Sequence, residues 1–96
     1  MDDSTKTAYQ TLLQQAMGHG SETSRDIAAI LLNSYNYNLP STGFAVGRFR
    51  HFDESSRRAV LRYLEWLGSA SGLYPPSEDM DALKAHWANM GWGDLN

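Results

Sequence analysis

The stretch from residue 52 to residue 68, FDESSRRAVLRYLEWLG, has the clearest helical pattern in this chain of 96 residues. Asp53 is a preferred N-cap residue, because its carboxylate can accept hydrogen bonds from the first backbone N–H groups of a helix. Gly68 suits the left-handed conformation that often closes a helix. Between them, apolar side chains recur at helical spacing and form one stripe: Val60, Tyr63, Leu64 and Leu67. Such a stripe must be buried against other elements, so we expect the rest of the chain to pack around this helix.

Three further segments are predicted to be helical, namely residues 4–17, 21–35 and 77–90. The segment 21–35 is apolar over more than half of its circumference, which favours the most buried position in the fold. Its Thr23, followed three residues later by Asp26, resembles a capping box. Ser77 is predicted to cap the last helix.

The connection over residues 36–50, NYNLPSTGFAVGRFR, interrupts the helical pattern with Asn, Pro and Gly. It is longer than most helix–helix connections, which favours a functional role. Its apolar residues could instead fold back as a lid on the core: Leu39, Phe44, Val46 and Phe49. The run GFAVGRF is predicted to be a short extended segment or a 3₁₀ turn. The sequence therefore predicts a single all-α domain over residues 1–96, a small bundle of about four helices with one long irregular connection.

Composition excludes several classes of protein. The chain has no cysteine, so it has neither a disulfide framework nor a thiolate metal site. Its first residues, MDDSTKT, lack the basic and apolar regions of a signal peptide. No apolar run approaches the ~18 residues that a membrane-spanning helix needs. We expect a soluble, cytoplasmic protein without a membrane partner.

The sequence contains no motif that indicates catalytic activity. His19, His51 and His86 have neither a cysteine partner nor the spacing of a metal-binding motif. The chain shows no Gly-rich phosphate loop and no nucleophile motif. We expect no enzyme activity, no bound metal and no cofactor.

A basic segment is the main candidate for a binding surface. Residues 48–62 hold five arginines against two acids, whereas the flanking segments are acidic and the net charge is −3. The planar guanidinium group suits carboxylate and phosphate partners. The candidate partner-binding residues are Arg48, Arg50, His51, Arg57, Arg58, Arg62 and Trp66. The alternative interpretation is that these arginines form ion pairs within the molecule. Glu54 lies four residues before Arg58, and Glu65 lies three residues after Arg62.

Aromatic residues support the same surface. Trp66 lies off the predicted apolar stripe, Trp92 follows the last helix, and Tyr37 lies in the irregular connection. Tryptophan, tyrosine and arginine dominate the energetics of protein interfaces. In a domain of this size the same residues can equally belong to the core or its rim.

Nucleic-acid binding is the alternative function. The first two predicted helices are joined by Gly18-His19-Gly20, the spacing of a helix-turn-helix. The start of the second helix would then read base edges, but it carries only Arg25 between two acids. The five arginines of residues 48–62 could also bind the phosphate groups of a nucleic acid. The net negative charge of the chain counts against such binding.

The run AAILLNSYNYNLP, with RFRHFDESSRRAVLRYLEWL after it, resembles short helical proteins of unknown function associated with bacterial mobile elements or phages. The shared features, over about residues 27–67, are a helix ending in LLxxYN, a Phe-containing polar loop and an Asp-capped helix. This chain has STGFAVGRFR where an acidic loop is expected in that family. The resemblance implies a small accessory protein, an inhibitor or adaptor of a larger complex with a possible anti-defence role, and no catalytic residues to carry over.

Together these observations predict a non-catalytic helical interaction module that binds a larger protein. A homodimer is compatible with the wide apolar coverage of the second helix, since the surface of such a dimer would be a symmetric patch.

Overall fold

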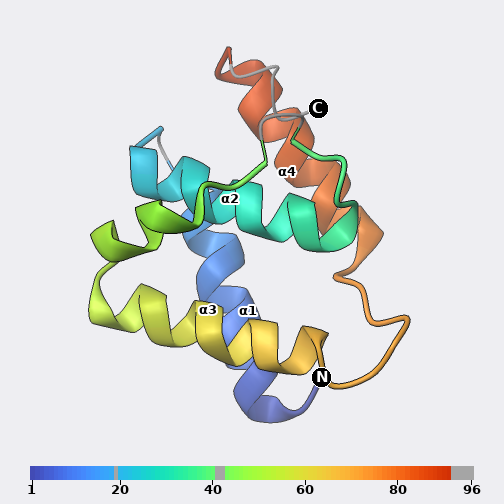
Figure 1. Cartoon of the computed structure of the whole chain (residues 1–96). Coiled ribbons are helices and arrows are strands. Elements are labelled where there is room, and N and C mark those ends of the chain that lie inside the picture. Colours follow the sequence, from blue (N-terminus) through green and yellow to red (C-terminus); the bar gives the residue numbers. More distant parts are fainter. Residues whose placement is uncertain (19, 41–42, 92–96) are drawn as a thin grey trace.

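The computed structural model describes residues 1–18, 20–40 and 43–91 of the chain (Figure 1). These ranges contain no strand and five helices: α1 (Asp3–Ala16), α2 (Glu22–Tyr35), the 3₁₀ helix η1 (Val46–His51), α3 (Glu54–Leu67) and α4 (Ser77–Asn89). The predicted all-α fold is therefore confirmed. Of the two conformations predicted for the run GFAVGRF, residues 43–49, the 3₁₀ turn is the one found: η1 begins at Val46 and continues beyond the run to His51. His19 and Trp92 lie outside the described residues.

Side-chain caps define where three of the helices begin. The carboxylates of Asp2 and Asp53 accept the N–H groups of Thr5 and Ser56, each at 2.7 Å. The predicted cap at Asp53 is thus confirmed. The prediction of a cap at Thr23 was wrong, because the hydroxyl of Ser21 accepts the N–H of Ser24 at 3.0 Å and starts α2 earlier.

Two other predicted helix ends also differ in the structure. Ser77 does not cap α4 but is its first residue, because the carbonyl of Pro76 already accepts the N–H of Met80 at 3.2 Å. Gly68 is not left-handed, since its φ is −85°. The hydroxyl and the N–H of Ser69 both donate to the carbonyl of Trp66, at 2.6 and 3.0 Å, so the end of α3 is closed without a left-handed residue.

The expectation that the other elements pack around α3 was wrong: α1 is the helix on which α2 and α3 both pack, while α2 and α3 make little direct contact with each other. Figure 1 shows these two helices running side by side across α1. Six consecutive residues of α2, from Ile27 to Leu32, are buried, so α2 is the most buried helix, as predicted. The rings of Tyr9 and Tyr63 stack at 5.9 Å between centroids and join α1 to α3.

Helix α4 is fastened to α1 by polar contacts at both ends. The indole Nε1 of Trp87 donates to the carbonyl of Ala16 at 2.8 Å, and the hydroxyl of Tyr9 donates to Asp79 Oδ2 at 2.8 Å. His86 on α4 is half-buried, and its Nε2 lies 2.8 Å from the carbonyl oxygen of Gly18.

The buried face of α3 differs in phase from the predicted stripe. Val60 and Tyr63 are buried as expected, but Leu64 is exposed, and Ser56 is buried instead. The reason is the position of α1, whose Gln15 side-chain oxygen accepts a hydrogen bond of 2.9 Å from the Ser56 hydroxyl. The leucines on the α2 side of α3 are left without a covering element.

Candidate protein-binding groove

The structure divides the predicted arginine surface into separate contacts. Arg48, on η1, donates from Nε to Asp26 Oδ2 at 2.7 Å and from Nη2 to Glu22 Oε2 at 3.0 Å. Hydrogen bonds from Asp26 first and Glu22 second hold the pKa of Arg48 above its ordinary value. This arginine therefore fastens η1 to α2. Its partners lie 22 and 26 residues away, so no local pattern in the sequence indicates them.

The two arginines in the middle of α3 form the ion pairs within the molecule that the alternative interpretation predicts. Arg58 pairs with Glu54 at 2.8 Å on an exposed surface. Arg62 lies 3.9 Å from Glu65 and also 3.4 Å from Asp2, so it links α3 to the start of α1. Exposed pairs of this kind contribute at most about 1 kcal/mol each.

The other predicted binding residues do not gather in one place. Arg50 and Arg57 are exposed and form no ion pair with any residue in the described ranges. His51 is exposed beside Asp53, where it borders a shallow hollow. Trp66, for which both an interface anchor and a place at the rim of the core were considered, is half-buried at the rim, where its ring packs at 5.7 Å against that of Tyr63.

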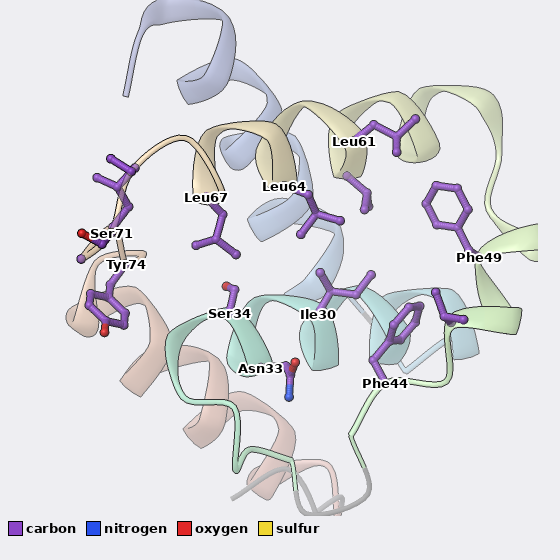
Figure 2. Close-up of a pocket in the computed structure, with 15 residues that line it drawn as sticks. Ile30, Asn33, Ser34, Phe44, Phe49, Leu61, Leu64, Leu67, Ser71 and Tyr74 are labelled. Atoms are coloured by element: carbon purple, nitrogen blue, oxygen red, sulfur yellow. The ribbon is translucent and has the colours of Figure 1, made fainter.

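A groove that the sequence analysis did not predict lies between α2 and α3 (Figure 2). It has a volume of about 560 Å³. One long wall is α3 and the other is α2, while η1 and its preceding residues close one end and residues 70–74 close the other. The apolar side chains along it include Ile30, Phe44, Val46, Phe49, Val60, Leu61, Leu64, Leu67, Leu73 and Tyr74.

Large apolar side chains are unusually accessible along this groove. Leu61 and Leu64 on α3 are 55% and 42% exposed, and Val46 and Tyr74 at its two ends are 80% and 63% exposed. Most of the exposed large apolar residues in the described part of the chain thus lie here. Contiguous exposed apolar surface of this kind typically marks an interaction site.

Two polar side chains on the α2 wall of the groove, Asn33 and Ser34, form hydrogen bonds within the molecule, and the hydroxyls of Ser71 and Tyr74 lie toward one end. The amide of Asn33 donates to the carbonyls of Tyr37 and Leu39 at 3.2 and 3.3 Å. The hydroxyl of Ser34 donates to the carbonyl of Leu31 at 2.6 Å and shares a hydrogen bond of 2.6 Å with the Tyr63 hydroxyl. None of the described side chains that line the groove carries a charge. Apolar contact is therefore the chemistry that this surface offers.

One signal in the sequence could have revealed the groove. The second half of α3 contains Val60, Leu61, Tyr63, Leu64, Trp66 and Leu67, which is more apolar surface than one buried face holds. Some of these side chains must therefore face away from the core. Leu61 is one that the predicted apolar stripe of this helix did not include.

Residues 1–18, 20–40 and 43–91 offer neither a metal site nor a membrane-spanning helix. No group of three or more His, Asp or Glu side chains in these ranges is placed to hold a metal ion. Every helix there is too short or too polar to cross a membrane.

Comparison with known proteins places the chain in a family. Residues 6–91 match the model of a family of unknown function, DUF7673, and the chain belongs to that family. No curated protein matches the chain. No solved structure matches it either.

Proposed function

We propose that this member of a family of unknown function is a non-catalytic interaction module whose apolar groove binds another protein. The observation that carries the proposal is the uncovered groove between α2 and α3, with Leu61 and Leu64 exposed on its wall. Fully burying a leucine side chain contributes about 1.5–3 kcal/mol, so a partner that covers these half-exposed residues gains part of that amount for each.

The contact surface of this module is then the leucines of the groove and not the arginines predicted from the sequence. Arg48, Arg58 and Arg62 each have carboxylate partners within the molecule, so binding a partner through them would break existing pairs. The groove has no such competing contact. A role as an inhibitor or adaptor in a phage or mobile-element setting, and a cytoplasmic location, stay predictions of the sequence analysis.

The test is the double variant Leu61→Glu, Leu64→Glu, compared with Ala85→Glu as a control. Ala85 is exposed on α4, which does not line the groove. The tagged protein would be used to capture partners from lysate of the source cells. The captured protein would then be identified by mass spectrometry and its binding repeated with purified components in a calorimeter. We expect the double variant to bind at least about tenfold more weakly, because buried apolar anchors carry most interface energy. The control should bind as the wild type does.

Two results would contradict this assignment. If Arg58→Glu, Arg62→Glu abolished binding while the leucine variant retained it, the arginine surface would be the site. If nucleic acid were recovered instead, and were released by salt and by nuclease, the alternative function would replace the proposed one. Far-ultraviolet circular dichroism of every variant shows that the helices persist.

A further inference from the structure

We propose that the groove takes the apolar face of a single amphipathic α-helix from the partner, with acidic side chains of that helix beside Arg57. This inference rests on the proposed function and specifies the chemistry of the occupant. It draws on three features of the groove: its walls, its length and the charge at one end.

The walls favour a helix over an extended peptide. A peptide that adds as a strand needs a row of unpaired backbone N–H and C=O groups beside it. Both long walls here are α-helices, α2 and α3, whose backbone groups bond within each helix. Asn33 and Ser34 use their polar groups within the molecule as well. The occupant must therefore satisfy its own backbone, as a helix does.

The same features disfavour a polar small molecule. Pockets for such ligands place several polar groups so that they converge on the bound molecule. In this groove the Asn33 amide N–H and the Ser34 hydroxyl bond within the molecule and the described lining has no charge, which leaves mainly the hydroxyls of Ser71 and Tyr74, at one end, to orient a polar ligand.

The length of the groove matches that of a short helix. From Val60 to Leu67 the wall formed by α3 advances by seven residue steps, roughly 10 Å at a rise of about 1.5 Å per residue. Apolar anchors at i, i+4 and i+7 on a partner helix cover the same distance. Figure 2 shows Leu61, Leu64 and Leu67 along one side and Ile30 opposite, so that such anchors would lie between them.

The charge at one end completes the description. Arg57 precedes Leu61 by four residues and Leu64 by seven, so helical geometry places it on the same strip of α3, beyond the apolar wall. It is exposed and forms no ion pair within the described ranges. Hydrogen bonds from Ser56 are the main reason that the pKa of Asp53 is lowered, and the charge of Arg57 contributes less, so this carboxylate is engaged chiefly with Ser56. Arg50 is exposed on η1 at this end too. Acidic side chains of the occupant would find complementary charge here.

The experiment uses three synthetic peptides and the full chain. The first peptide, of roughly fifteen residues so that it can form a helix, has leucines at i, i+4 and i+7 and two glutamates one turn before the first leucine. The second has lysines in place of the glutamates, and the third has the composition of the first in scrambled order. Each carries a fluorescent label, and binding is followed by fluorescence anisotropy.

We expect the acidic peptide to bind the wild type about fivefold more tightly than the lysine peptide, since exposed charge pairs contribute up to about 1 kcal/mol. Arg57→Glu should invert that preference. Leu61→Glu, Leu64→Glu should weaken both peptides at least about tenfold, whereas Ala85→Glu should change neither.

Three results would overturn the inference. The first is equal binding of the scrambled peptide, or no binding of the acidic one up to about 1 mM. The second is a charge preference that Arg57→Glu leaves unchanged. The third is a wild type that sediments as a dimer and becomes a monomer on Leu61→Glu, Leu64→Glu, because the occupant would then be a second copy of this chain. If binding of the purified natural partner requires Leu61 and Leu64 while no peptide binds, this inference fails and the proposed function stands. If neither the natural partner nor any peptide requires Leu61 and Leu64 for binding, the inference and the proposed function both fail.

Discussion

The guanidinium of Arg48 lies 2.7 Å from the buried carboxylate of Asp26 and fixes one end of the groove. The contact is needed because η1 has no buried residue of its own. Besides this ion pair, η1 is held by the ring of Phe49, which packs at 5.5 Å against Phe52. A short 3₁₀ helix has weak internal hydrogen bonding, so its position depends on such side-chain contacts.

Replacing Arg48 by methionine should therefore loosen η1 more than it unfolds the protein. The buried carboxylate of Asp26 loses its partner, and the apolar side chain of the variant cannot replace the two hydrogen bonds. We expect faster amide hydrogen exchange over residues 46–51 and unchanged exchange in α1. The matched control is Arg58→Met, which breaks an exposed pair of similar length, 2.8 Å. Equal effects of the two variants on residues 46–51 would contradict the role given to Arg48.

Truncating leucines should distinguish the core from the groove. Leu83 is fully buried, so Leu83→Ala is expected to lower the free energy of unfolding by about 2–5 kcal/mol. Leu61 is exposed on α3, and Leu61→Ala should cost less than about 1 kcal/mol, because the site loses little packing and alanine favours helix. Urea denaturation measures both values. Similar losses would mean that Leu61 is a core residue.

The sequence was sufficient for several features that depend on neighbouring residues, although the caps at Thr23 and Ser77 and the left-handed end at Gly68 were predicted wrongly. The helices of the fold and the cap at Asp53 were predicted correctly, since capping and apolar spacing act over one or two turns. The pairing of Arg58 with Glu54 was foreseen for the same reason.

Features set by distant contacts were not predictable in this way. Arg48 meets Glu22 and Asp26 only because η1 folds back onto α2. The exposure of Leu64 follows from the position of α1 on the opposite side of α3, where Ser56 bonds to Gln15. A helical pattern shows how much apolar surface a helix has, but the packing of the other helices decides which part is covered.

The buried hydroxyl of Tyr63 predicts a loss of stability in alkali. Burial raises the pKa of Tyr63 from its ordinary value of 10.0 to about 12, and burial together with Asp79 raises the pKa of Tyr9 as well. The unfolded chain therefore releases these protons before the folded protein does. The contribution of Tyr63 is complete below pH 10 and is lost as the pH rises toward about 12. Denaturation at a series of pH values should show this decline, and Tyr63→Phe should make it shallower. A slope unchanged by Tyr63→Phe would contradict the assignment.

The cap of α3 predicts a corresponding loss in acid. Hydrogen bonds from Ser56 first, and the charge of Arg57 after them, hold the pKa of Asp53 below its ordinary value of 3.8. A lowered pKa means that this carboxylate stabilises the fold fully above about pH 4, and that its contribution is lost as the pH falls through the lowered pKa. Asparagine caps helices as well as aspartate does but does not titrate. Asp53→Asn should therefore keep most of the stability at neutral pH and reduce its decline in acid, whereas Asp53→Ala should lose stability at every pH. Thermal unfolding of the three proteins between pH 2 and 7 tests this expectation, and identical curves for the two variants would show that the cap at Asp53 does not stabilise α3.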